Sequence, residues 1–435
     1  MAARRTWHRA EMVGAGRTDS YTTRNAYIPP HRRHNPERTV REAQADIRDL
    51  GLRADLEVLG KDPWPTSRCI LRDANENEVA RGAGKGFLED SISGAYAEAL
   101  EHYWSGMHLA IPSDQTTLMR ASEIADQPQL SKDQVIRRLG EEFSECMVGC
   151  CWFYPYLASG PEIAYPMFLK FPQYINAPFP GDELEYLTLS RYMCGSGTAA
   201  GLSDQEATLH GILEKIEHDA LSLSLLDWFA FGGKRHCKIL NRTRLPEPIA
   251  NLWATAEDTI GCEIRVIDVT SDLGLPAFLA LTAEECFQVG VTGAGASTDG
   301  PYAVQRALSE CMQDYRLRNS MREQSLLEDS AILASLKAWP FLQSCSRLSW
   351  SELSSVAEIS ETYLHENKTW WNISRCEQIT RKHLKQAGFE SYFTPLNPSP
   401  YRVRVTTVVV PGLELFNIVR GGIPIAPTGR GLSNS

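Results

Sequence analysis

The sequence contains no apolar stretch that approaches the roughly 18–20 residues needed to cross a bilayer. Arg4 and Arg5 lie near its beginning, but no apolar core follows them, so a secretory signal peptide is not expected. We also find no internal repeat and no low-complexity tract. With 43% hydrophobic and 23% charged residues, the 435-residue chain has the composition of an ordinary globular protein. These features predict a cytoplasmic protein without a membrane partner.

Cysteines at paired spacing are also missing. The eleven cysteines are scattered, and only Cys146, Cys150 and Cys151 form a cluster, with no histidine or cysteine pair at zinc-binding spacing nearby. This pattern argues against a zinc site, and it is typical of buried thiols in a reducing compartment. The sequence alone singles out no reactive thiol among the eleven.

Basic residues are concentrated at the beginning of the chain. Residues 1–40 contain eight arginines, no lysine and three acids, a net charge of +5, so the remaining residues carry −15 within an overall charge of −10. An acidic body argues against nucleic acid as the main ligand, because phosphate contacts need a basic surface. We therefore expect residues 1–40 to form a flexible basic arm that serves as a tail or a docking segment.

Hydrophobic periodicity predicts an α/β protein with long helices against mixed sheets. The expected helices cover residues 39–52, 92–104 (capped by Asp90 or Ser91), 204–228 and 302–319. The expected strands cover residues 70–80 (a hairpin with its turn at 73–77), 264–269, 277–281 and 401–410. The glycine-rich residues 82–86 and 293–295 are interpreted as a tight loop and a turn, residues 166–180 as an irregular connection, and residues 320–395 as mixed but mainly helical.

Carboxylates are spaced to share one face on three of these helices. The first helix carries Glu98 and Glu101, the second carries Glu206, Glu214 and Glu217, and the third carries Glu310 with Gln313. Residues three apart on a helix are neighbours, with Cβ atoms roughly 5–6 Å apart, so like charges repel. Apolar neighbours such as Leu100 and Ile216 indicate partly buried helices, where carboxylates need a cation. Because Mg²⁺ is usually held by carboxylates together with substrate phosphates, we interpret these segments as parts of one Mg²⁺ site.

Two familiar motifs are absent near these acids. Gly84-Lys85-Gly86 lacks the glycine five positions before the second glycine and the Ser or Thr after lysine that a Walker P-loop requires. A phosphate contact of another kind stays open, since the Lys85 ammonium can act as a point charge. His210 and Glu214 do not follow the His-Glu-x-x-His order of zinc proteases, which argues against a zinc hydrolase.

Four segments, residues 81–103, 197–219, 261–276 and 307–316, resemble in their order the signature segments of the YcaO family. The resemblance runs from about residue 81 to residue 414. It implies a YcaO-type fold, with long helices on mixed sheets, that binds ATP and Mg²⁺. Residues 41–435 are then expected to form the catalytic domain, including a proline-containing tail over residues 423–435.

The same resemblance implies roles for individual residues. It assigns Mg²⁺ to Glu98, Glu101, Glu214 and Glu217, and nucleotide contacts to Lys85, Ser93, Glu206, Glu310 and Gln313. Glu214, Glu217 and Arg316 are the expected catalytic residues, with Arg316 as a phosphate contact. Ser196 stands where the family usually has asparagine, and His218 where it often has arginine, so these two positions depart from the pattern.

The implied reaction is the activation of a peptide amide by phosphorylation, without a covalent nucleophile from the protein. Our first interpretation is a cyclodehydratase that forms thiazoline or oxazoline from Cys, Ser or Thr of a ribosomal precursor peptide. Two alternatives stay open, namely a thioamide-forming enzyme that uses external sulfide and a non-catalytic scaffold. The resemblance also implies a leader-binding partner similar to ubiquitin-activating enzymes, an FMN-dependent dehydrogenase, and a homodimer within a hetero-oligomer.

Azoline-forming relatives often end in a proline-rich tail that reaches the active site. Here the tail has a loose version, Pro424-Ile-Ala-Pro427. Proline fixes φ and lowers the entropy lost when a tail is held in one path. We therefore expect residues 424–427 to pack near the nucleotide site and residues 431–435 to be mobile.

Overall fold

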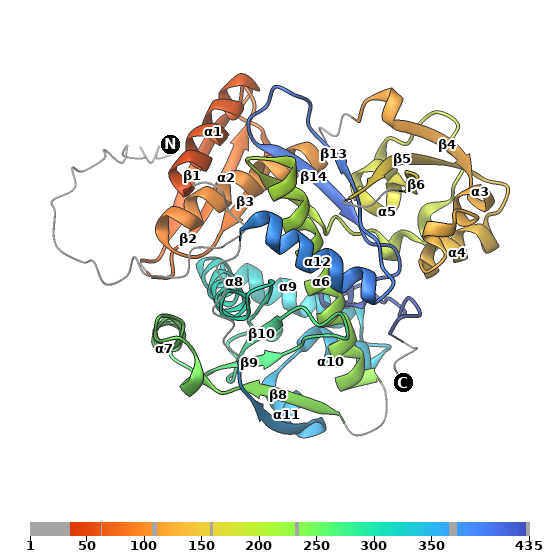
Figure 1. Ribbon diagram of the computed structural model, residues 1–435. Helices are drawn as coiled ribbons and strands as arrows, with labels where there is room; N and C mark the ends of the chain where they lie inside the picture. Colours follow the sequence, from red (N-terminus) through yellow and green to blue (C-terminus); the bar gives the residue numbers. More distant parts are fainter. Residues whose placement is uncertain are drawn as a thin grey trace, which may run out of the picture.

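A computed structural model describes residues 35–61, 63–106, 111–156, 160–230, 235–364 and 372–431 of the protein. As expected, the fold is mixed α/β, with long helices packed on three sheets (Figure 1). Within these ranges no helix combines the length and the apolar character needed to span a membrane. Residues 1–34 of the expected arm lie outside the described ranges, and the first helix begins at Pro36.

The first sheet is antiparallel, in the order β1-β2-β3, and two helices cover it. Its elements are α1 (Pro36–Asp49), β1 (Arg53–Leu59), β2 (Thr66–Arg72), β3 (Glu78–Gly84) and α2 (Leu88–Ser105). The predicted hairpin is confirmed, and Asp73 Oδ1 shapes its turn by accepting the N–H groups of Asn75 and Asn77 at 2.8 and 2.9 Å. Both predicted helices are confirmed, but the cap of α2 is Phe87, so the expected cap at Asp90 or Ser91 is wrong.

The second sheet joins segments that are far apart in the sequence. Its strand order is β4-β5-β13-β14-β7, with β6 paired to β5. These strands are β4 (Thr116–Arg120), β5 (Met147–Pro155), β6 (Ile163–Pro166), β7 (Thr198–Gly201), β13 (Tyr392–Pro395) and β14 (Arg404–Val409). Helix α6 (Asp204–Leu225) packs on β7 and β14 and runs through the centre of the molecule (Figure 1). The helix predicted over residues 204–228 and the strand predicted over 401–410 are therefore confirmed.

The third sheet has the order β11-β10-β9-β8-β12, in which β12 pairs parallel to β8. Its strands are β8 (His236–Leu240), β9 (Ile264–Asp268), β10 (Ala277–Thr282), β11 (Thr292–Ala296) and β12 (Glu358–Thr362). Helices α7 (Glu247–Ile260) and α8 (Gly300–Ser320) share a hydrophobic core with it. The predicted strands 264–269 and 277–281 and the predicted helix 302–319 are confirmed.

The glycine-rich residues 82–84 and 293–295 lie in strands, which corrects the loop and the turn expected there. Each of these strands is followed in the chain by a long helix that packs tightly on it. A Cβ at Gly84 would lie 1.7 Å from the Ser91 carbonyl oxygen of α2, and one at Gly293 would lie 2.1 Å from the Cys311 nitrogen of α8. Glycine is therefore needed for close helix-on-strand contact, and this contact brings the acidic faces of the helices together.

The remaining segments follow the expectations only in part. Residues 320–395 are mainly helical, with α9 (Arg322–Ser335), α10 (Pro340–Arg347), α11 (Trp350–Val356) and α12 (Ile373–Gln386), but they also contain β12 and β13. Residues 166–180, expected as an irregular connection, contain the short α5 (Met167–Lys170) and a 3₁₀ helix (Pro172–Asn176), so only residues 171 and 177–180 are irregular. The helices α3 (Ala121–Ala125) and α4 (Gln134–Glu142) and the strands β4 to β7 were not predicted.

Candidate active site

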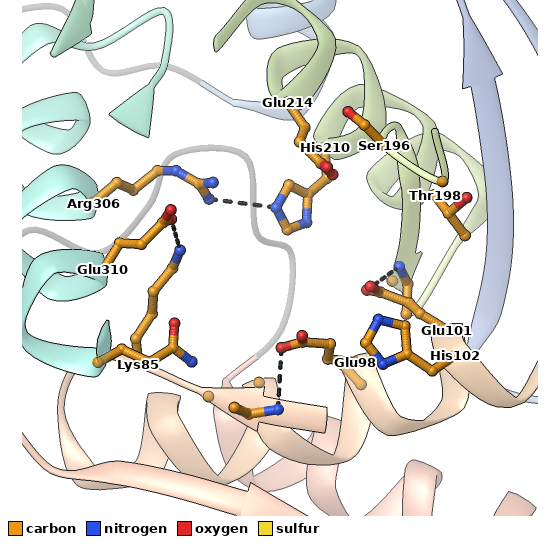
Figure 2. A pocket seen from close by; sticks show the side chains of 18 of the residues that line it. Lys85, Glu98, Glu101, His102, Ser196, Thr198, His210, Glu214, Arg306 and Glu310 are labelled. Carbon is orange, nitrogen blue, oxygen red and sulfur yellow. Dashed lines mark hydrogen bonds and ion pairs between the residues drawn. The ribbon is translucent and has the colours of Figure 1, made fainter. Parts of the chain in front are cut away.

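A cavity of about 760 Å³ is lined by α2, α6 and α8 together with the end of β3 and the loop before β7 (Figure 2). Nine of the ten residues predicted from the sequence line it, namely Lys85, Ser93, Glu98, Glu101, Glu206, Glu214, Glu217, Glu310 and Gln313. The structure thus brings together the three acidic segments, which are spread over residues 98–313 of the sequence. Their individual roles stay predictions.

Helix α2 contributes carboxylates that are fixed by backbone groups of neighbouring strands. Glu98 Oε2 accepts the N–H of Ala83 in β3 at 3.1 Å, and Glu101 Oε1 accepts the N–H of Ala200 in β7 at 2.7 Å (Figure 2). Burial raises the pKa of Glu98, and the charge on Glu214 across the cavity adds to this rise, whereas His102 and the Ala83 N–H oppose it. Glu98 and Glu214 are therefore close enough to repel each other.

Helix α6 carries its acids along the face that lines the cavity. Glu206 Oε2 accepts the Leu202 N–H at 3.1 Å, and Glu217 Oε2 accepts the Ala296 N–H of β11 at 2.9 Å. Glu217 is 5% exposed and lies 3.7 Å from the guanidinium of Arg306. Burial and the charge of Glu310 raise the pKa of Glu217, because both disfavour its ionised form.

Helix α8 supplies Glu310 and Arg306 to the cavity, and Lys85 reaches Glu310 from the end of β3. Glu310 forms an ion pair with Lys85, and Arg306, one turn before it, contacts His210 at 3.4 Å (Figure 2). Burial alone would raise the pKa of Glu310, but the charge and hydrogen bond of Lys85 bring it below the usual value. This part of the cavity therefore contains carboxylates with built-in cations.

Two arginines of the cavity were missed by the sequence reasoning. Arg306 lies four residues before Glu310, a spacing that places both on one helix face and could have identified it. Arg420 comes from the distant turn Phe416–Gly421 and donates to Thr292 Oγ1 at 2.6 Å, and no local signal marks it. Burial lowers the pKa of Arg420, and the Nε atoms of both arginines have no hydrogen-bond partner among the described residues. Both arginines line the cavity, where their guanidinium groups can face an anionic ligand.

Arg316 is not among the residues that line the cavity. Its Nε donates to the Trp64 carbonyl at 2.6 Å, and its guanidinium lies beside Gly60. Arg316 is six residues beyond Glu310, which on a helix of 3.6 residues per turn puts it on another face. The structure therefore does not bring the expected phosphate contact to the site.

The donor set fits Mg²⁺ only in combination with other oxygen ligands. Within the described ranges, no three His, Cys, Asp or Glu side chains are grouped closely enough to hold a metal ion alone. Mg²⁺ is commonly bound through one or two carboxylates, waters and substrate phosphates, so separated acids around a nucleotide-sized cavity suit it. Glu98 and Glu214 would hold such an ion, with Lys85, Arg306 and Arg420 facing phosphate oxygens.

The two positions that depart from the family pattern, Ser196 and His218, both line the cavity. His218 Nε2 lies 4.0 Å from Glu214 Oε1. Burial would lower the pKa of His218, but a hydrogen bond with Cys194 and the charge of Glu214 raise it overall. His218 can therefore supply part of the positive charge that an arginine would bring.

The carboxyl-terminal tail packs elsewhere. None of residues 423–431 lines the cavity, which does not support the expected packing of residues 424–427 near the nucleotide. The buried Glu414 accepts the N–H groups of Thr428 and Gly431, and Arg430 pairs with Asp219 at 3.2 Å. The expected mobility is wrong for Gly431, which is buried, whereas residues 432–435 lie outside the described ranges.

Similar proteins are found in archaea and bacteria. An uncharacterised protein of Methanothermobacter thermautotrophicus is 25% identical over 228 residues, which cover 51% of this chain and 56% of that protein. An uncharacterised protein in the tfuA 3′ region of Rhizobium leguminosarum bv. trifolii is 24% identical over 296 residues, which cover 64% of this chain and 65% of that protein. The chain thus spans less than two thirds of the length of these relatives.

Solved structures share the fold. A Methanopyrus kandleri YcaO bound with AMPPCP and Mg²⁺ has a TM-score of 0.64 and 19% identity, covering 92% of this chain and 98% of that one. A heterocyclase in complex with substrate and cofactor has a TM-score of 0.63 and 17% identity, covering 88% and 53%. The E. coli microcin synthetase McbBCD complex has a TM-score of 0.58 and 14% identity, covering 84% and 88%.

The family comparison covers most of the chain. Residues 83–414 match the family described as YcaO cyclodehydratase, ATP- and Mg²⁺-binding. This range includes all nine of the predicted residues that line the cavity. The chain therefore belongs to the YcaO family of ATP- and Mg²⁺-binding enzymes.

Proposed function

We propose that this protein is an ATP-dependent cyclodehydratase that converts Cys, Ser or Thr residues of a ribosomal precursor peptide into thiazolines or oxazolines. One observation carries the proposal: in a YcaO chain, carboxylates from three helices and the cations Lys85, Arg306 and Arg420 line one cavity of about 760 Å³. This combination suits phosphoryl transfer from a nucleoside triphosphate, because that reaction depends on positioning and on charge neutralisation.

In the proposed reaction, the substrate side chain adds to the preceding carbonyl carbon and loses its proton. The carbonyl oxygen takes the γ-phosphoryl group of ATP, and ADP is released. The C–O bond then breaks as phosphate leaves, while the amide nitrogen loses its proton and forms the C=N bond of the azoline. Bound Mg²⁺ would supply further neutralisation of phosphate charge. The side chains of the protein bind ATP, orient its γ-phosphate toward the peptide and neutralise phosphate charge.

The cavity divides these tasks among its walls. We assign Mg²⁺ to Glu98, Glu101 and Glu214, and nucleotide contacts to Lys85, Ser93, Glu206, Glu310 and Gln313. Glu217, which the sequence also assigned to Mg²⁺, is proposed instead to align Arg306, whose guanidinium lies 3.7 Å from it. Arg306 and Arg420 take the phosphate-contacting role first expected of Arg316, because they line the cavity and Arg316 does not.

The assembly is proposed from the solved complexes. The E. coli microcin synthetase structures contain McbBCD, in one case with pro-MccB17 bound. By analogy, we propose that this chain acts on a precursor peptide together with a separate leader-binding partner and an FMN-dependent dehydrogenase, as a homodimer within that complex.

Mass spectrometry of a peptide encoded beside the gene tests the function. With the purified chain, its partner protein, ATP and Mg²⁺, we expect the loss of one water for each modified residue, only at Cys, Ser or Thr, with peptide-stimulated release of phosphate. Exchange of oxygen for sulfur that depends on added sulfide would establish thioamide formation instead. A peptide that binds without stimulating any ATP turnover would establish a scaffold.

A further inference from the structure

One side of the cavity contains a thiol, a hydroxyl and an imidazole that the proposed reaction does not use. Cys194 and Ser196 lie in the loop before β7, His218 lies on α6, and all three line the cavity. Cys194 also lines a second cavity, of about 30 Å³, which extends to residues 409–413 and Thr428. The thiol therefore sits between the nucleotide cavity and the carboxyl-terminal segment.

The polar atoms around Cys194 are not satisfied within the described part of the chain. Ser196 is 8% exposed, and its Oγ has no hydrogen-bond partner there. The Nδ1 atom of His218 likewise has no hydrogen-bond partner in that part of the chain. An unpaired buried polar group is costly, so two such groups beside one thiol indicate a site for a polar ligand group.

Two buried lysines lie near this corner of the cavity. Lys170 of α5 is 3% exposed and donates to the carbonyls of Ser196 and Gly195, the latter at 3.4 Å. Lys215 of α6 is 8% exposed. Burial and the neighbouring charge of Lys215 lower the pKa of Lys170 to about 7. The other titratable groups that act on this cluster are Tyr165, Glu214, Glu217 and Asp133.

His218 and Lys215 act directly on the Cys194 thiol. Burial would raise the pKa of Cys194, but the hydrogen bond with His218 and the charge on Lys215 lower it to about 7. The thiolate is the nucleophilic form of cysteine, and neighbouring lysine and histidine favour it. Cys194 thus lines the cavity and also lies beside groups that stabilise its thiolate.

The other ten cysteines lack this combination. Seven are buried, and burial raises the pKa of thiols such as Cys150 and Cys311 well above the usual value. Cys146, Cys262 and Cys286 are partly exposed like Cys194, but none of them lines the cavity. They provide matched controls of similar accessibility.

We propose that Cys194 is a modification site that forms mixed disulfides with low-molecular-weight disulfides inside the nucleotide cavity. The Cys194 thiolate attacks one sulfur of the disulfide, a new S–S bond forms, and the other half leaves as a thiolate. A second small thiol reverses the step by the same exchange. The attached group occupies the cavity, so modification and nucleotide binding exclude each other.

Reaction of the full-length protein with 4,4′-dithiodipyridine tests this site without using ATP turnover or a peptide substrate. We expect one fast equivalent of released thiopyridone, with a rate at least about fivefold above the other accessible thiols at pH 7, because Cys194 is then about half ionised. Peptide mass mapping should locate the adduct on Cys194. A first adduct on Cys146, Cys262 or Cys286 would overturn the proposal.

Protection and variants sharpen the test. Mg²⁺ with AMPPCP should slow the fast phase at least about fivefold, and unchanged labelling at saturating AMPPCP would overturn the shared-cavity claim. The fast phase should disappear in Cys194→Ser and persist in the matched Cys286→Ser. His218→Gln should slow it with Cys194 still the labelled residue, and an unchanged rate would show that His218 has no influence on the thiol.

Discussion

The cavity contains two pairs of carboxylates whose members repel each other, and only one pair forms ion pairs with lysine or arginine among the described residues. Glu217 and Glu310 are accompanied by Arg306 and Lys85. Glu98 and Glu214 form no ion pair with lysine or arginine within the described residues, and their charges act on each other. The first pair is thus neutralised by the protein itself. The second pair has the charges of His102, Lys85 and His218 near it but no such ion pair among the described residues. An added cation would therefore stabilise it, which is the behaviour expected of a Mg²⁺ site.

Backbone contacts fix one acid of each pair. The Ala83 N–H holds Glu98, and the Ala296 N–H holds Glu217. Hydrogen bonds from backbone amides favour the ionised carboxylate and oppose the effect of burial, which still raises the pKa of both acids. The difference between the pairs therefore lies in their cations and not in their anchoring. We infer that the Glu98–Glu214 end binds Mg²⁺ and that the Glu217–Glu310 end aligns the cations that contact phosphates.

The strongest way to break this comparison is the double variant Glu98→Gln with Glu214→Gln. Glutamine keeps the size of the side chain and can still accept the Ala83 N–H, but it removes the charge that needs a metal. Peptide-stimulated ATP turnover should fall at least about 1,000-fold, since loss of even an outer partner of a metal ligand costs up to about 100-fold in metal affinity. Calorimetry should show that Mg²⁺ no longer strengthens AMPPCP binding.

The matched control is Glu89→Gln, because Glu89 is an exposed acid in the first turn of α2, away from the cavity. This variant should retain turnover and Mg²⁺ dependence. Normal Mg²⁺-dependent turnover in the double variant would overturn the metal assignment at this end.

The helices of the site could be predicted from the sequence because their signals are local. Helical spacing of Glu98 and Glu101, or of Glu214 and Glu217, is enough to place each pair on one face. The strands at residues 82–84 and 293–295 were missed because glycine reads locally as a chain breaker. These positions are glycine because the backbones of α2 and α8 pack directly against them. Local propensity carries no information about that long-range contact.

The cations of the site show the same limit. Lys85 was found from its glycine-rich surroundings, and Arg306 has a usable helical spacing to Glu310. Arg420 reaches the cavity only because a turn near the end of the chain packs against Thr292. Arg316 was chosen by counting one turn onward from Gln313, although two steps of three residues rotate it away from Glu310. Long-range packing therefore explains both why Arg420 was missed and why Arg316 lies outside the cavity.

A smaller effect is expected at the end with built-in cations. Arg306→Met leaves Glu217 and Glu310 with Lys85 as their main neighbour and removes a phosphate contact. We expect turnover to fall about 100-fold, the scale reported for removing one preorganised donor. Mg²⁺ should still strengthen AMPPCP binding in this variant, which separates it from the double variant. Loss of the Mg²⁺ effect in Arg306→Met would show that the two ends are not distinct.

The smallest effect on catalysis is expected for Arg316→Met. Arg316 shares α8 with Arg306, but its Nε is bound to the carbonyl of Trp64, a residue that is only 2% exposed. Turnover should stay within about threefold of the unmodified protein, and the free energy of unfolding should fall by about 1 kcal/mol for the lost hydrogen bond. Urea unfolding and ATP turnover measured on the same preparation check both. A drop in turnover comparable to that of Arg306→Met, with unfolding unchanged, would return Arg316 to the site and end the assignment of its role to Arg306.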